Sequence, residues 1–247
     1  MQKLITKLSK KYLSDKSILK LAKFRQLSRR IIKPRLIYFL FKHLKPISNI
    51  YGSERGMPID RYYIEEFLDQ NKKHIQGDCL EIEDNNYTLK YGEQRVKKSD
   101  ILDINHVNRR ATIYGDLRKL NNVSNNSYDC IILTQVLQYI DDCESAVEEC
   151  YRILKPRGVL LATFPSIGRV DCAAGVDGDF WRFTTASANY IFSKFFLKIN
   201  LEIKAWGNVL VGLGFWVGLA REELTKRELN YLDQNFPCLM TVKAIKE

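Results

Sequence analysis

Residues that bind metals are scarce in this sequence. Its six cysteines include no C-x-x-C pair, and only three histidines are available to help hold a metal ion. Structural zinc sites are built from Cys and His ligands at short, regular spacings. We therefore expect no metal site, and we expect reduced thiols of the kind found in cytoplasmic proteins.

Long apolar stretches are also missing. The longest, from Val209 to Ala220, has 12 residues, whereas a membrane-spanning helix needs about 20. The basic start lacks the apolar segment of a secretory signal, because lysines at positions 3, 7, 10, 11, 16 and 20 interrupt every candidate. The sequence predicts neither a spanning helix nor secretion.

Positive charge is concentrated at the start of the chain. The formal net charge is +10, yet residues 1–50 hold 14 Lys and Arg against one acid, which leaves 25 bases and 28 acids for the rest. Apolar residues recur at helical spacing in this arm, as at Leu4, Leu8 and Tyr12, and predict a basic amphipathic helical extension.

Two interpretations of this arm stay open. It either adheres to the anionic inner face of a membrane, at about 1 kcal/mol per basic residue, or it packs on the body as a solvated helical extension. Nucleic-acid binding is disfavoured, because the acidic body offers no continuing basic groove.

Residues 51–247 alternate between strand and helix patterns. The segment 128–133 is a near-continuous apolar run, which is typical of a strand covered on both faces of a parallel sheet. The alternation predicts one α/β domain, a doubly wound and mostly parallel sheet of seven strands. Strands are expected at 79–82, 96–102, 111–114, 128–133, 159–164, 201–206 and 240–245, and helices at 59–67, 145–154, 185–196 and 208–220.

Three stretches of this domain carry a recognisable pattern. They are ATIYGDL (111–117), SYDCIILTQVLQYI (127–140) and ILKPRGVLLATFP (153–165). In this order and spacing they resemble the class I S-adenosylmethionine-dependent methyltransferases, in particular the type 11 methyltransferase domain. Two more, ERGMPIDRYYIEEFL (54–68) and DFWRFTTASANYIF (179–192), resemble a bacterial branch of such domains associated with surface-glycan genes.

The resemblance implies a Rossmann-like methyltransferase fold, S-adenosylmethionine as cofactor, and no metal. It further implies methyl transfer to a small-molecule or glycan-type acceptor, with oxygen as the accepting atom. Transfer from a sulfonium depends chiefly on positioning, and a general base is needed only for hydroxyl acceptors. No catalytic residue is assigned for that reason.

One family motif is degenerate here. The family's first strand ends in E-x-G-x-G-x-G, whereas this chain reads LEIEDNNYTLKYG, with Glu83 and Asn85 where the first two glycines belong. If the turn keeps a positive φ, Asn85 tolerates it best and Glu83 poorly. The carboxylates of Glu83 and Asp84 also approach the place of the cofactor's own carboxylate, at up to about 4 kcal/mol per like pair at ~4 Å.

This degeneracy has two further consequences. Because so few residues separate Ile82 from Val96, the first crossover helix must be short or absent. A second hypothesis also stays open, namely a methyltransferase-like binding or scaffolding module of surface-glycan biosynthesis that has lost catalysis.

The resemblance also implies a set of cofactor-binding residues. Asp100 is the implied ribose acceptor, with Asp103 as its rival and turn capping as the alternative role. Asp116 is the implied partner of the adenine amino group, although a Gly-Asp pair is also ordinary turn chemistry. The full set is Glu81, Ile82, Glu83, Asp100, Asp116, Leu117, Thr134 and Gln135.

A loop beyond the fifth strand holds the candidate acceptor-binding residues. Asp179, Trp181 and Arg182 offer a carboxylate, a ring for stacking on a sugar, and an anion clamp. The competing interpretation is a surface loop with Trp181 anchored in the core.

Overall fold

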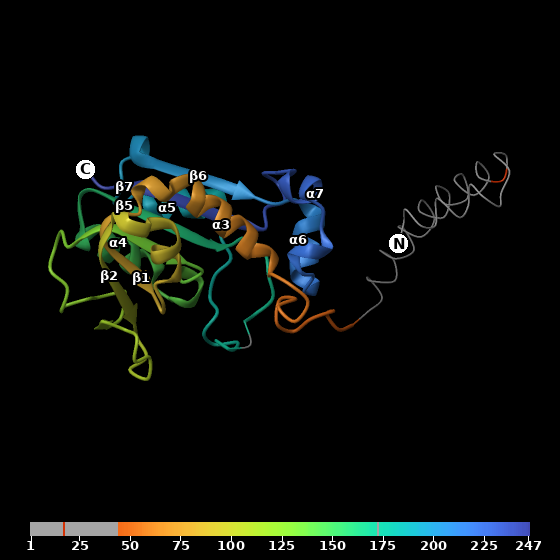
Figure 1. Cartoon of the computed structure of the whole chain (residues 1–247), viewed down its shortest axis with the longest axis horizontal. Helices are drawn as coiled ribbons and strands as arrows, with labels where there is room; N and C mark the ends of the chain where they lie inside the picture. Colours follow the sequence, from red (N-terminus) through yellow and green to blue (C-terminus); the bar gives the residue numbers. More distant parts are fainter. Residues whose placement is uncertain (1–16, 18–43, 172) are drawn as a thin grey trace. The chain divides into compact units, whose positions relative to one another are not determined.

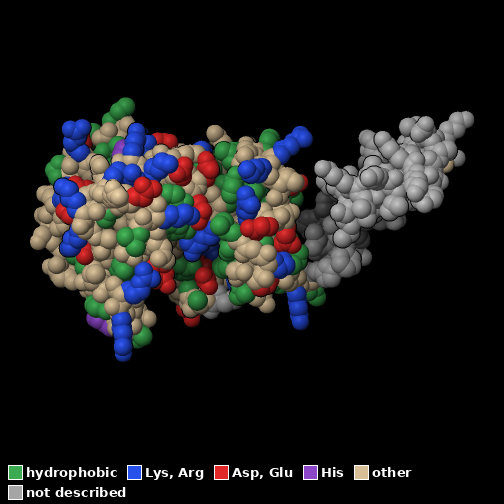
Figure 2. Space-filling model, viewed as in Figure 1, with side chains coloured by type: hydrophobic (Ala, Val, Ile, Leu, Met, Phe, Trp, Pro, Cys, Tyr) green, Lys and Arg blue, Asp and Glu red, His purple; other side chains and the backbone are tan. Residues whose placement is uncertain are grey.

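The computed structural model describes Ser17, residues 44–171 and residues 173–247 (Figure 1). Ile47–Glu247 forms one compact unit, which begins shortly before residue 51, the start of the domain expected from sequence. The helices expected in the basic arm lie outside the described residues, and so does Cys172. Lys and Arg side chains alternate with Asp and Glu over the visible face, with no large area of one sign (Figure 2).

Seven strands form a single sheet in the described part of the chain. Their order is β3-β2-β1-β4-β5-β7-β6. β7 runs antiparallel to β5 and β6, and the other neighbours are parallel. This confirms the predicted doubly wound, mostly parallel sheet. The strands are β1 (Gly77–Ile82), β2 (Val96–Asp103), β3 (Ile113–Tyr114), β4 (Tyr128–Thr134), β5 (Leu154–Pro165), β6 (Leu201–Trp206) and β7 (Leu239–Ile245).

Helices cover both faces of this sheet, so its strands contribute side chains to two hydrophobic cores. Successive side chains of a strand point to opposite faces, and Ile131 and Ile132 of β4 accordingly enter different clusters. One core includes residues of α4 (Cys143–Ile153) and α5 (Thr185–Phe192). The other includes residues of α3 (Ile59–Asn71), α6 (Val209–Val217) and α7 (Lys226–Asn230), and α6 and α7 lie side by side (Figure 1).

Most predicted elements are present, with shifted ends. The strand expected at 201–206 is β6, and the helix expected at 145–154 is α4. β5 begins at Leu154, earlier than expected, because Leu154 already pairs with Tyr128 of β4 before the register shifts ahead of Val159. α6 ends before residue 220 because Gly218 takes the left-handed conformation (φ +81°), which terminates helices. α7 was not predicted.

The first connections carry no full α-helix. β1 and β2 are joined by a π-helical turn, Thr88–Gly92, and a 3-10 turn, Glu93–Arg95. Between Lys72 and Asp142, all of it described, the chain forms no α-helix beyond residues 86–87, which lead into the π-helical turn. The prediction that the first crossover helix is short or absent is therefore confirmed.

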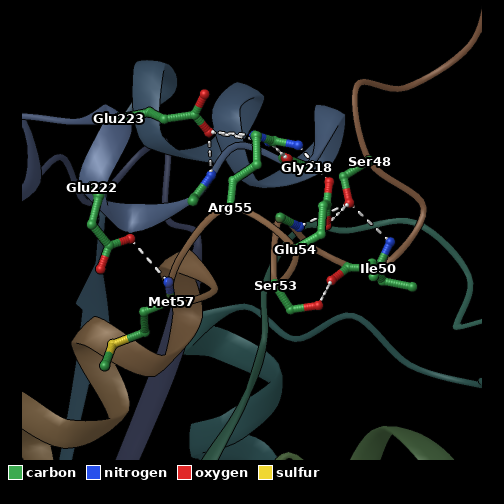
Figure 3. Close-up of polar contacts among 11 residues, drawn as sticks. Ser48, Ile50, Ser53, Glu54, Arg55, Met57, Gly218, Glu222 and Glu223 are labelled. Carbon is green, nitrogen blue, oxygen red and sulfur yellow. Dashed lines mark hydrogen bonds and ion pairs between the residues drawn. The ribbon is translucent and has the colours of Figure 1, made fainter.

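A short N-terminal segment is fastened to the end of α6 (Figure 3). Arg55 donates to the carbonyl of Gly218 at 2.5 Å and pairs with Glu223 at 3.1 Å. Ser48 donates to Glu54 at 2.8 Å, and Met57 N–H donates to Glu222 at 2.9 Å. These contacts place residues 47–57 against α6 and the 3-10 turn Arg221–Glu223.

Candidate active site

A cleft of about 700 Å³ opens at the carboxyl ends of β1, β2, β3 and β4. Its walls come from the turns that follow these four strands, with one side closed by α3 and the π-helical turn. Open parallel sheets bind ligands at this edge, where the strand order reverses. Here β1 lies between β2 and β4, so the cleft sits at that reversal.

Glu81 supports the turn after β1 from inside. The residue is 2% exposed, and its carboxylate accepts hydrogen bonds from the backbone N–H groups of Tyr87 (3.2 Å) and Thr88 (2.7 Å). Burial raises the pKa of Glu81 to about 7, although these hydrogen bonds lower it. Its carboxylate thus fixes the shape of the turn that borders the cleft.

Glu83 takes the left-handed backbone that the family's first glycine would occupy. Its φ is +69°, a conformation that costs a non-glycine residue free energy. Asn85, which tolerates such a φ better, does not adopt it. The Glu83 side chain is exposed at the edge of the cleft. The strain therefore falls on the residue least suited to it.

The loop between β2 and β3 donates hydrogen bonds to the turn that follows β1. Asn108 donates to the Glu83 carbonyl at 2.7 Å, and Arg110 donates to the Asn85 side chain at 3.0 Å. Asn85 in turn donates to Ser99 on β2 at 3.0 Å and does not line the cleft. Side-chain contacts thus stabilise a turn that in the family depends on glycine.

Asp103, and not Asp100, lines the cleft after β2. Asp100 is 4% exposed within the sheet. Its carboxylate accepts from Tyr128 and Thr112, each at 2.9 Å, and pairs with Lys98 at 2.7 Å. These partners keep the pKa of Asp100 low although desolvation raises it. Asp100 is already saturated, which leaves Asp103 to face a ligand.

Asp116 and Leu117 line the cleft beyond β3. The Asp116 carboxylate accepts from Arg118 at 2.6 Å, and Arg118 also pairs with Asp141 at 2.6 Å. The Arg118 hydrogen bonds lower the pKa of Asp116. Asp116 is therefore ionised and held in one orientation at the cleft wall.

Thr134 ends β4, Gln135 follows it, and both line the cleft. Gln135 has φ +55°, and strained backbone of this kind clusters at functional sites. Its backbone N–H donates to the Thr163 carbonyl at 2.8 Å, while its side-chain Nε2 is buried without a partner. That unpartnered donor belongs to a residue that lines the cleft.

The basic wall of the cleft was not predicted. Arg61 of α3 and Lys90 of the π-helical turn both line it. Arg61 donates to Tyr87 at 2.6 Å, and Lys90 pairs with Glu65 at 2.9 Å. Arg61 lies in the 54–68 stretch, ahead of the three stretches from which the cofactor-binding residues were predicted, so only the packing of α3 reveals its place.

A second pocket of about 170 Å³ adjoins the cleft and shares Arg61, Gln135 and Tyr139 with it. Two of the predicted acceptor-binding residues line it, Asp179 and Arg182, which form a bidentate pair at 2.6 and 2.8 Å. This pair lowers the pKa of Asp179.

Trp181 does not line either pocket. It is 41% exposed, and its indole N–H donates to the Ile140 carbonyl at 2.8 Å. The structure therefore places Trp181 on the surface beside the site, anchored by that hydrogen bond. In the described residues, no cluster of three or more His, Cys, Asp or Glu side chains is arranged to hold a metal ion.

The strand order, the antiparallel seventh strand and the cleft at the reversal define the Rossmann-like fold of class I S-adenosylmethionine-dependent methyltransferases. Residues 65–162 match the family model described as a methyltransferase domain. This part of the chain is therefore similar to a methyltransferase domain, as the sequence motifs predicted. None of the curated proteins matches the sequence.

Solved structures agree on the fold. A putative sarcosine dimethylglycine methyltransferase from Galdieria sulphuraria aligns with TM-score 0.54 and 14% identity, over 77% of this chain and 90% of that one. An S-adenosylmethionine-dependent methyltransferase from Archaeoglobus fulgidus aligns with TM-score 0.51 and 12% identity, over 75% and 94%. At such identities the likeness shows the fold alone.

Proposed function

We propose that this chain transfers a methyl group from S-adenosylmethionine to a hydroxyl oxygen of a small-molecule or glycan-type acceptor. The observation that carries the proposal is the proximity of two cavities, a cleft of about 700 Å³ and a pocket of about 170 Å³, which share the lining residues Arg61, Gln135 and Tyr139. Holding two reactants in adjoining sites is what group transfer needs most.

The residues of the larger cleft fit the cofactor. Its volume lies within the range of about 300–1,000 Å³ typical of small-molecule sites. Asp103 would accept hydrogen bonds from the ribose hydroxyls, a role that we assign to it in place of Asp100. Asp116 and the backbone of Leu117 would hold the adenine, and the Asp116 carboxylate would keep its hydrogen bond from Arg118. When bound, the cofactor supplies an activated methyl group on a sulfonium sulfur.

Arg61 can offset the negative charge that Glu83 and Asp84 bring to the cleft. Glu83 and Asp84 bring negative charge to the cleft, and Arg61 and Lys90 line the same cleft. Arg61 is the better candidate partner for a ligand carboxylate, because Lys90 is already paired with Glu65. Since Glu83 is also exposed, water screens much of its repulsion.

The smaller pocket supports a hydroxyl acceptor. Tyr51, Tyr139 and Phe215 line it together with hydrogen-bonding side chains, and aromatic faces combined with polar groups suit a sugar ring. At about 170 Å³ it admits a single small fragment of the acceptor.

We further propose that residues 1–50 hold the protein at an anionic membrane surface on the cytoplasmic side. The support is their charge of 14 bases against one acid. No helix within the described residues is both long and apolar enough to cross a bilayer.

Calorimetric titration with S-adenosylhomocysteine tests the proposed function. We expect saturable binding to the full chain, and weaker binding by Asp103→Asn. Absence of heat and of any thermal shift at millimolar ligand would remove methyl transfer and favour a binding or scaffolding module.

A further inference from the structure

The small pocket beside the cleft contains one carboxylate that no side chain engages. The pocket is lined by Asp60, Asp171 and Asp179. Asp179 is bound by Arg182 at 2.6 Å, and Asp171 accepts from the Tyr139 hydroxyl at 2.7 Å. Asp60, in the first turn of α3, accepts only the backbone N–H of Arg61 at 2.9 Å among the described residues.

Three buried polar atoms around the same pocket also have no partner. They are Nε2 of Gln135, Nε of Arg182 and Oε1 of Gln138. Gln138 is only 3% exposed, and its Nε2 is used in hydrogen bonds to Gln135 at 3.0 and 3.1 Å. Buried polar groups are almost always satisfied, and these two donors and one acceptor all belong to residues that line a single pocket.

The chemistry of these atoms selects the ligand. Two donors and one acceptor together match hydroxyl groups, which both donate and accept. The acids of the pocket are equal in number to its arginines, Arg61, Arg169 and Arg182, so the pocket has no net charge to attract a phosphate. A neutral, hydroxyl-bearing fragment satisfies both conditions.

We propose that Asp60 is the general base that accepts the proton of an acceptor hydroxyl bound in this pocket. This inference rests on the proposed function. The hydroxyl oxygen forms a bond to the methyl carbon, the carbon–sulfur bond breaks with its electron pair going to sulfur, and the proton passes to the Asp60 carboxylate and then to water. The products are a methyl ether and the neutral thioether of the cofactor.

The surroundings of Asp60 suit this role. Burial raises the pKa of Asp60, and Arg61 and the backbone hydrogen bonds only partly offset that effect. A carboxylate with a raised pKa is a stronger base than one in water. The titratable and charged groups that face it are Arg61 on α3, Tyr51, Tyr87, Cys238, and across the pocket Asp171, Asp179, Arg169 and Arg182.

The test uses the full chain, radiolabelled S-adenosylmethionine and a panel of neutral methyl glycosides at high concentration. We expect methylation of at least one glycoside. Asp60→Asn should lower its rate about 10²-fold or more, with the S-adenosylhomocysteine dissociation constant unchanged within about twofold. The wild-type rate should rise with pH through the Asp60 pKa, and Asp60→Asn should lose that limb. Asp69→Asn, on the same helix outside both pockets, is the matched control.

Each other outcome has a defined meaning. If S-adenosylhomocysteine does not bind, the proposed function fails. If it binds but no glycoside is methylated, the neutral hydroxyl acceptor is wrong while the cofactor site stands. If Asp60→Asn transfers at the wild-type rate, or keeps the pH limb, Asp60 is not the base. Retained S-adenosylhomocysteine binding by Asp60→Asn also shows that this variant is folded.

Discussion

Replacing Glu83 with glycine should improve both the stability and the cofactor affinity of this protein. Glu83 is held at φ +69°, and left-handed backbone costs an L-residue about 1–2 kcal/mol. Glycine removes that strain but loses roughly 0.5–1 kcal/mol of chain entropy. We therefore expect a net gain of about 0.5–1 kcal/mol in the free energy of unfolding.

The affinity change follows from charge. Like charges at ~4 Å repel by about 1 kcal/mol in water and about 4 kcal/mol at an effective dielectric of ~20. Because Glu83 is exposed, the lower value applies, which is roughly fivefold in the dissociation constant. Glu83→Gln removes the charge and keeps the strain, so it separates the two effects.

Urea unfolding and titration with S-adenosylhomocysteine measure both quantities on the wild type, Glu83→Gln and Glu83→Gly. Both variants should bind S-adenosylhomocysteine more tightly than the wild type does. Glu83→Gly should also be more stable than Glu83→Gln, which keeps the backbone strain. A glycine variant less stable than the glutamine variant would refute the strain argument. Unchanged affinity in both would refute the electrostatic one.

Three other perturbations test separate parts of the structure. Asp103→Asn should weaken S-adenosylhomocysteine binding at least about tenfold, since charged hydrogen bonds contribute about 1.5–3 kcal/mol, whereas Asp69→Asn, outside the cleft, should not; equal losses in calorimetry would contradict the assignment. Glu81 has a folded pKa of about 7 against an ordinary 4.5, so its contribution to stability is full at low pH and is lost as the pH rises through 7. Between about pH 4.5 and 8, the free energy of unfolding in urea should fall by about 3 kcal/mol more for the wild type than for Glu81→Gln. Parallel pH profiles of the two proteins would be inconsistent with a raised pKa. The full chain should co-sediment with anionic vesicles at low salt and less at high salt, and a chain of residues 47–247 should not; equal pelleting of both would exclude the arm as the membrane-binding element.

The sheet could be predicted from sequence because its strands are marked by composition. The apolar run of β4 and the bounds of β6 followed from local pattern, and the three family-like stretches fixed their order. Element ends were less predictable, because they depend on single residues such as Gly218 and on pairing partners.

The candidate site was only partly predictable. Asp100 and Asp103 are three positions apart, so they lie on opposite faces of β2 if both belong to the strand. Choosing between them needs the exact strand end and the neighbours Tyr128 and Thr112, which come from distant segments. Through the packing of α3, Arg61 reaches the cleft and Asp60 reaches the smaller pocket, and no local pattern encodes either placement.

The hydrogen bonds and ion pairs that hold residues 47–57 against the end of α6 determine where the chain can be shortened without disturbing the smaller pocket. Tyr51 lies in this stretch, stacks on Phe215 with ring centroids 5.4 Å apart, and forms part of the acceptor pocket wall. Trimming the protein to begin at Pro58 would spare every strand yet open that pocket to bulk water. A truncation that begins at Ile47 removes most of the basic arm and keeps the pocket wall formed by Tyr51. Methyl transfer can therefore be measured on this truncated chain without the proposed membrane-binding arm.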